Sequence, residues 1–155
     1  MIKLPLTEPA IRALLPHSAD MCLIDSLLEW SPESALCQTQ THRRHPHPLA
    51  ENGRLGSANL IEYAAQCMAL HGALLAPPAD NRHSGSQPHG VLAGVRKINL
   101  LIDDIQAIAG PLSIRVSLLS GDSKTAIYDF SVSTDHTPLA DGRATVMFMI
   151  DPGSA

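Results

Sequence analysis

The stretch SANLIEYAAQCMALHGALLA, residues 57–76, decides the fold of this chain. It follows Gly56 and runs without a proline until Pro77 and Pro78. Serine is suited to cap the N-terminus of a helix, and proline ends helices because it has no N–H to donate. The spacing therefore predicts one long helix, with Ser57 as its N-cap.

One face of this helix is apolar and is predicted to pack on a sheet. A lone histidine on such a face, His71, is expected to be a core residue with a satisfied hydrogen bond. The opposite side is not rich in Lys and Glu, as that of a helix open to water would be, so we expect both sides to be covered. The apolar face comprises Leu60, Ala64, Cys67, Met68, His71 and Leu75, flanked by Ile61 and Leu74, and the opposite side comprises Glu62, Gln66, Ala69 and Ala73.

The segments around the long helix are predicted to form an antiparallel sheet. Residues 7–15 predict a short helix with Thr7 as N-cap, lying as a lid over the core. One long helix combined with consecutive strands indicates a single α+β domain over residues 1–155. The strand-like runs are residues 21–30, 34–41, 91–102, 111–119, 125–134 and 138–150.

Composition argues against a nucleic-acid partner, against a fold held by disulfides or zinc, and against a membrane span. A net charge of -4 gives no electrostatic reason to expect nucleic acid, whose phosphates attract clustered Lys and Arg. Three cysteines without C-x-x-C spacing argue against a disulfide framework or a zinc ribbon. We expect a soluble, cytoplasmic protein with no membrane span, because neither a signal peptide nor a long uninterrupted apolar run is present.

Glu62 is the anomaly of the long helix, as the only charged residue between Ser57 and Ala76. Burying a carboxylate without a partner costs several kcal/mol or raises its pKa until it becomes neutral. Either effect suits a catalytic acid. Alternatively, Glu62 lies at a partly solvated edge of the domain, where its negative charge interacts favourably with the positive N-terminal end of the helix dipole.

The segment HRRHPHP, residues 42–48, contains three closely spaced histidines. Their spacing is a weak indication of a metal site, because no Cys or second His pair provides further ligands. One of them is instead expected to act as a general base, since imidazole titrates near neutral pH. The residue types alone leave His42, His45 and His47 as alternatives.

Two segments resemble the FabZ-type 3-hydroxyacyl-acyl carrier protein dehydratases: LLPHSADMCLIDSLLEW, residues 14–30, and HPLAENGRLGSANLIEYAAQ, residues 47–66. GRLGSANLIEYAAQCMALHG, residues 53–72, is most similar to the dehydratase-like subunits encoded with aryl polyene pathways. The resemblance implies a hotdog fold, an antiparallel sheet wrapped around one long central helix. It also implies that His17 is structural.

In that family a His-Pro segment leads into the central helix, whose first turns carry an acidic residue followed by Ala-Gln. The resemblance therefore implies that His47, rather than His45, is the base that removes the C2 proton, and that Glu62 holds and protonates the 3-hydroxyl. Backbone N–H groups of Ser57 and Ala58 are expected to polarise the thioester carbonyl, and Gln66 to orient Glu62. The expected reaction needs no cofactor and no metal.

The resemblance further implies partners. The histidine and the acid of one site come from different subunits in the family, so a homodimer or heterodimer is expected to cover the Glu62 side of the helix. The acyl chain is expected beside Ala69 and Ala73. The acyl carrier protein is expected to meet Arg43, Arg44, Arg96 or Lys97, which are otherwise ordinary surface charges.

Two alternative functions remain on the same fold. In an acyl-thioester hydrolase, Glu62 would activate water and no histidine would be needed. In a non-catalytic partner subunit, the chain would stabilise or shape an active dehydratase. The second alternative is favoured by Pro48, which follows His47 where the family has an aromatic residue.

Overall fold

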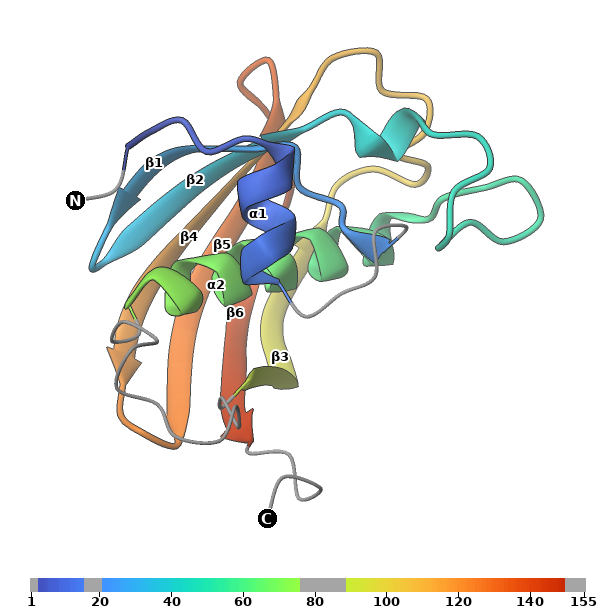
Figure 1. The fold of residues 1–155 in the computed structure, drawn as a ribbon. Coiled ribbons are helices and arrows are strands. Elements are labelled where there is room, and N and C mark those ends of the chain that lie inside the picture. The colour runs from blue at the N-terminus through green and yellow to red at the C-terminus, as the bar shows by residue number, and fades with distance from the viewer. Residues whose placement is uncertain (1–2, 16–20, 76–88, 150–155) are drawn as a thin grey trace.

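The computed structural model describes residues 3–15, 21–75 and 89–149, and Figure 1 shows how their helices and strands are arranged. His17 and the loop between the long helix and the next strand lie outside the described residues. The elements are α1 (Glu8–Leu14), β1 (Ser26–Ser31), β2 (Ser34–Thr39), the 3-10 helices η2 (Thr41–Arg43) and η3 (Ser57–Asn59), α2 (Leu60–Leu75), β3 (His89–Leu100), β4 (Leu112–Gly121), β5 (Thr125–Thr134) and β6 (Thr137–Met149).

Six strands form one antiparallel sheet in the order β1-β2-β4-β5-β6-β3, so β1 and β3 are its edges. Five predicted strands are confirmed, whereas the run 21–30 is a strand only from Ser26. Strands β5 and β6 are joined by Asp135 and His136, which both have positive φ, 46° and 67°. Such turns match the right-handed twist of a hairpin, so β5 and β6 stay paired over most of their length.

The long helix is confirmed, but its beginning differs from the prediction. Ser57 is not the N-cap of α2, because it lies inside the 3-10 turn η3 and α2 starts at Leu60. The cap position of η3 is occupied by Gly56, which has no side chain to cap with. A 3-10 turn commonly opens an α-helix, so η3 and α2 together form the predicted helical stretch.

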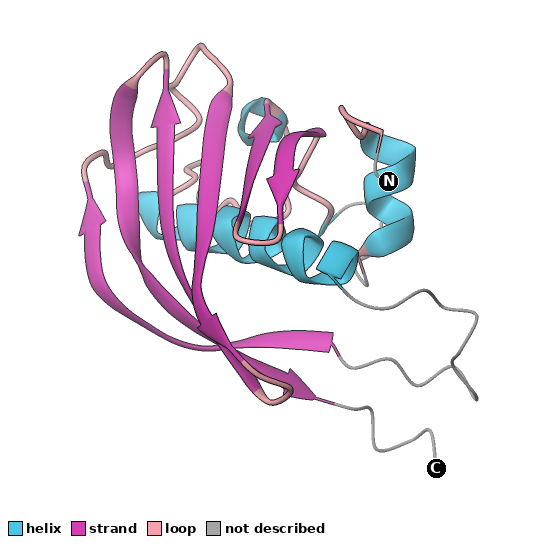
Figure 2. Ribbon diagram, turned by 90° about the vertical axis from the view of Figure 1, so that its left-hand side faces the viewer, coloured by secondary structure: helices cyan, strands magenta, loops and turns pink. Residues whose placement is uncertain are grey.

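Helix α2 lies across the concave face of the sheet, which curves around it in Figure 2. In β5 the buried residues that face the helix alternate with partly buried ones, as expected for a half-buried sheet. The predicted apolar face is buried except for Leu75, which is 42% exposed at the helix end. This arrangement is the hotdog fold predicted from the sequence.

The other side of α2 is also covered, and much of the cover comes from the same chain. Helix α1 crosses in front of α2 in Figure 1, with Ile11 and Leu15 buried. Tyr63, Gln66 and Leu70 on this side of α2 are buried as well. At Gln66 the cover comes from the chain itself, and cover of this side by a neighbouring chain stays a prediction.

His71 is a core residue, as predicted. Its Nδ1 is 2.8 Å from the hydroxyl of Tyr128, and its Nε2 is 2.9 Å from the carbonyl oxygen of Ser31. A carbonyl only accepts, so Nε2 carries the proton and the Tyr128 hydroxyl donates to Nδ1. Burial lowers the pKa of His71 and keeps the ring neutral. The three cysteines are likewise buried, and none forms a disulfide.

Candidate functional site

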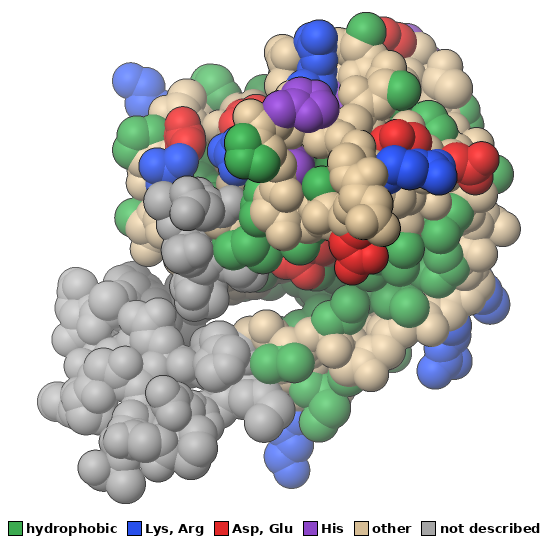
Figure 3. All heavy atoms as spheres, turned by 90° about the vertical axis from the view of Figure 1, so that its right-hand side faces the viewer, with side chains coloured by type: hydrophobic (Ala, Val, Ile, Leu, Met, Phe, Trp, Pro, Cys, Tyr) green, Lys and Arg blue, Asp and Glu red, His purple; other side chains and the backbone are tan. Residues whose placement is uncertain are grey.

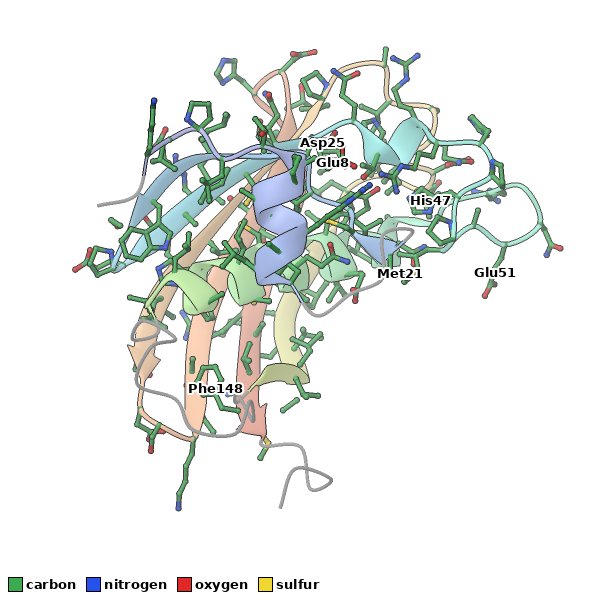
Figure 4. All side chains as sticks on the ribbon, viewed as in Figure 1. Glu8, Met21, Asp25, His47, Glu51 and Phe148 are labelled. Carbon is green, nitrogen blue, oxygen red and sulfur yellow. The ribbon has the colours of Figure 1, made fainter. Side chains whose placement is uncertain are left out.

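The histidine loop, residues 41–56, lies beside the beginning of α2, where Figure 4 also places Met21. The loop is held against residues 103–109, which follow the edge strand β3. The contacts between them are the bridge Gly56–Asp104, the backbone bond from Ile105 to Leu55, and side-chain bonds from His42 to Ile108, Arg43 to Ala109 and Gln106 to Arg44. The histidine loop is therefore anchored at several points.

His47 lies inside this loop, and only 5% of its surface is exposed. Its Nδ1 accepts a hydrogen bond of 3.0 Å from the backbone N–H of Leu49. Its Nε2 lies 3.1 Å from the hydroxyl of Tyr63. Burial is the main reason that the pKa of His47 is lowered, with smaller contributions from the positive charge of Arg44 and from the neighbouring histidines. The ring is therefore neutral near pH 7.

Tyr63 continues the hydrogen bonding from His47 into the core. Its hydroxyl is 3.0 Å from Oγ1 of Thr41, which in turn donates to the carbonyl oxygen of Leu23 at 2.6 Å. Tyr63 is fully buried, and burial raises its pKa to about 12. Tyr63 is not among the site residues predicted from the sequence. The available signal was a phenol next to Glu62 on an otherwise apolar helix, because a buried tyrosine hydroxyl needs a partner.

Glu62 lies in the first turn of α2 and is half-buried. The side-chain amide of Gln66 donates to Oε1 of Glu62 at 3.2 Å, which is the orienting contact predicted from the sequence. The same amide donates to the carbonyl of Met21 at 2.7 Å, and its oxygen accepts from the N–H of Leu23 at 2.8 Å. Gln66, which is 1% exposed, therefore connects the Glu62 carboxylate to the backbone of Met21 and Leu23.

The backbone donors expected for the thioester carbonyl are Ser57 and Ala58. The N–H of Ser57 donates to the carbonyl of Asp103 at 3.0 Å, so it must give up that bond before it can bind a substrate. Ala58 is exposed at the start of the helical stretch. The donor roles of both residues stay predictions.

The other two loop histidines differ in accessibility. His42 is fully buried, and its Nε2 is 3.0 Å from the carbonyl of Ile108. Burial lowers its pKa. His45 is exposed. Within residues 3–15, 21–75 and 89–149, no group of three or more His, Cys, Asp or Glu side chains is placed to hold a metal ion.

The four cationic side chains that are expected to meet the acyl carrier protein fall into two pairs. Arg43 and Arg44 belong to the histidine loop, where each donates to a backbone carbonyl. Arg96 and Lys97 are exposed on β3, at the open edge of the sheet. Contact with a carrier protein stays a prediction for all four.

Strand β3 exposes apolar side chains at this edge. Figure 3, which views the side where β3 lies, shows hydrophobic side chains bordering a recess with acidic side chains near its rim. The large exposed apolar residues here include Val91, Leu92, Val95, Leu100 and, just after the strand, Leu101, which are 36–59% exposed. An unpaired edge strand with apolar side chains is a template for another chain.

None of the helices in the described ranges has the length and hydropathy needed to span a membrane.

A second hollow, of about 420 Å³, lies on the sheet face away from α2, and serines, Gln38, Arg115 and His136 contribute to its walls. None of the predicted site residues lines it.

A family model described as ApeP-like, ApeP dehydratase, matches residues 9–152. The solved dehydratase heterocomplex ApeI:P from Xenorhabdus doucetiae is similar to this chain, with a TM-score of 0.76 and 22% identity over 99% of this chain and 95% of that chain. A mutant thioesterase from Pseudomonas aeruginosa has a TM-score of 0.64 and 17% identity, covering 92% and 94% of the two chains. A thioesterase from Haemophilus influenzae has a TM-score of 0.64 and 15% identity, covering 94% and 92%. No curated protein sequence matches.

Proposed function

This chain belongs to the ApeP-like dehydratase family, and from that premise we propose that it is one subunit of a cytoplasmic dehydratase. The proposed substrate is a 3-hydroxyacyl thioester on an acyl carrier protein, and the product is the trans-2-enoyl thioester. The proposed pathway is fatty acid or aryl polyene biosynthesis. The observation that carries the proposal is Glu62, held by Gln66 at the beginning of α2 in a chain whose family is a dehydratase family.

Elimination of water needs an acid for the departing hydroxyl, and Glu62 is proposed in that role. A carboxyl group that must donate at one oxygen works best when the other oxygen is fixed. The amide of Gln66 supplies that contact, and Gln66 is itself fixed by Met21 and Leu23. Preorganisation of this kind avoids rearrangement during the reaction.

The partner is proposed to be a second hotdog subunit that pairs along β3. This strand is a sheet edge, it exposes apolar side chains, and the similar structure from Xenorhabdus doucetiae is described as a dehydratase heterocomplex. A carrier protein, which is acidic, is proposed to approach Arg43, Arg44, Arg96 or Lys97. The acyl chain is proposed to run beside Ala69 and Ala73.

The base role expected for His47 has a structural requirement. A base accepts a proton through a free lone pair, whereas the Nδ1 lone pair of His47 now accepts from Leu49 and Nε2 contacts Tyr63. One of these contacts must be exchanged for the substrate before His47 can remove a proton.

Replacing Glu62 by Gln tests the acid role. The variant is assayed in complex with the subunit that copurifies with the chain, using a 3-hydroxyacyl pantetheine thioester. We expect the rate of enoyl formation to fall by about 100-fold or more, since general acid–base groups contribute about that much. Glu51→Gln, which changes an exposed carboxylate of the histidine loop, is the matched control. Unchanged elimination by Glu62→Gln would support the non-catalytic partner role instead.

A thioester hydrolase is the second candidate, favoured by the structural likeness to two thioesterases. In that reaction Glu62 would activate water to attack the thioester carbonyl. The two candidates separate when the same complex is given a 3-hydroxyacyl and a saturated acyl thioester. Release of free thiol from both substrates without enoyl formation would establish the hydrolase.

A further inference from the structure

The hydroxyl of Tyr63 belongs to a row of hydrogen bonds whose direction is fixed from both ends. At the His47 end, the N–H of Leu49 donates to Nδ1 at 3.0 Å, so in the neutral ring the proton is on Nε2. At the other end, the carbonyl of Leu23 can only accept, so Oγ1 of Thr41, 2.6 Å away, gives it its only proton. Thr41 therefore accepts from Tyr63, and Tyr63 accepts from Nε2–H of His47.

The two contacts of the His47 ring differ in how firmly they are held. The Tyr63 residue is fully buried, and its row of bonds ends on a backbone carbonyl in the core. Moving the ring away from Tyr63 would leave a buried N–H donor without an acceptor, which costs its full desolvation. The contact with Leu49 spans only two residues, inside a turn closed by the N–H of Ala50 and the carbonyl of His47. A substrate therefore displaces the Leu49 contact more readily.

This difference decides which nitrogen of His47 serves as the base. We infer that Tyr63 is a positioning residue that holds His47 by Nε2, so that Nδ1 removes the C2 proton once the substrate displaces the N–H of Leu49. The inference rests on the dehydratase function proposed above, with His47 as its base.

The row of bonds suits a base because every donor in it points away from His47. When Nδ1 takes a proton, the ring becomes a cation, and its Nε2–H bond to Tyr63 becomes a stronger, charge-assisted one. Neighbouring hydrogen bonds polarise one another, so the bond from Tyr63 to Thr41 adds to this effect. Tyr63 itself stays neutral, because burial raises its pKa to about 12.

Protons and electrons balance over the cycle. Nδ1 of His47 takes the proton from C2, and the electron pair of that C–H bond forms the C2=C3 double bond. The C3–O bond breaks, and the hydroxyl leaves with the proton of Glu62 as water. The proton on Nδ1 then returns to the Glu62 carboxylate through solvent, which restores both groups.

Replacing Tyr63 by Phe removes the acceptor for Nε2–H and keeps the aromatic ring. The variant is assayed in complex with the copurifying subunit, using a 3-hydroxyacyl pantetheine thioester. We expect kcat to fall about 10-fold or more while KM stays within about twofold of the parent, because a misplaced catalytic group slows the chemical step.

Tyr128→Phe is the matched control for a general loss of stability. It also removes a buried phenol hydroxyl that bonds a histidine, His71, outside the proposed site. This variant should lose stability but keep kcat within about twofold of the parent. Equal losses of kcat in Tyr63→Phe and Tyr128→Phe would overturn the inference, and so would an unchanged kcat in Tyr63→Phe.

Thr41 tests the next bond in the row. Thr41→Val removes the hydroxyl that accepts from Tyr63, so kcat should fall as in Tyr63→Phe. Thr41→Ser restores a hydroxyl and should recover most of the lost rate. Equal rates in the two Thr41 variants would contradict the inference.

The tautomer of His47 gives a readout that does not depend on activity or on the folding of a variant. In nitrogen-15 NMR of the parent chain at pH 7, we expect Nε2 protonated and Nδ1 unprotonated, and the opposite tautomer would overturn the inference. The dehydratase proposal fails separately, when Glu62→Gln leaves elimination unchanged.

Discussion

At the residue scale, the backbone of one residue, Leu23, joins the two predicted catalytic residues, His47 and Glu62. The carbonyl of Leu23 accepts from Thr41, which leads through Tyr63 to His47. The N–H of the same residue donates to Gln66, which holds Glu62. The position of the carboxylate and the position of the histidine loop therefore depend on the same short segment.

Tyr63→Phe removes the central hydroxyl of this network while it preserves the ring. Nε2–H of His47 then loses its acceptor inside the fold. An unsatisfied buried donor costs about 1–3 kcal/mol, so we expect the free energy of unfolding to fall by that amount. Urea denaturation followed by circular dichroism measures it.

Thr41→Val provides the matching half of a double-mutant cycle with Tyr63→Phe. The two side chains share one hydrogen bond, so the double variant should lose less than the sum of the single losses. Strict additivity would mean that the contact between Tyr63 and Thr41 does not contribute to stability.

At the element scale, two boundaries differ from the prediction, the beginning of β1 and the beginning of α2. Residues 21–25 read as a strand, but Leu23 uses its N–H and carbonyl for Gln66 and for Thr39 and Thr41. Backbone groups that bond to side chains are not available to a sheet ladder, and β1 starts at Ser26. At the start of the long helix, Ser57 lies inside the 3-10 turn η3, and its backbone N–H donates to the carbonyl of Asp103.

The edge strand β3 gives a prediction at this scale. Val95 is 39% exposed on an edge where none of the strands that the structure describes pairs with β3. Val95→Arg places a charge where a partner strand would pack, so we expect the partner to be lost on size-exclusion chromatography while the chain stays folded. Leu119→Arg on β4 is the control, because Leu119 is similarly exposed but away from this edge. Equal loss with both variants would contradict pairing along β3.

At the scale of the whole molecule, three buried histidines link stability to pH. The pKa values of His42, His47 and His71 are lowered below 6.5, mainly by burial. The folded chain thus excludes protons that the unfolded chain binds. The stabilisation is fully present above pH 6.5 and is lost as the pH falls from there through the folded-state values.

We therefore expect the free energy of unfolding to decrease between pH 7.5 and 5.5. Each histidine that stays neutral contributes up to about 1.4 kcal/mol per pH unit below 6.5. His71→Leu removes one such group and should make the decrease shallower. Denaturation midpoints across this range measure the slope, and constant stability in the parent would refute the linkage.

The sequence by itself determined the long helix, five of the strands and the contact of Gln66 with Glu62. Each of these follows from local periodicity, from proline positions or from a spacing of one helical turn. Only the tertiary structure decided that Leu23 connects the two predicted site residues and that Tyr63 occupies the nitrogen of His47. Those contacts join residues 16 to 43 positions apart, and no periodic pattern encodes which buried donor meets which acceptor.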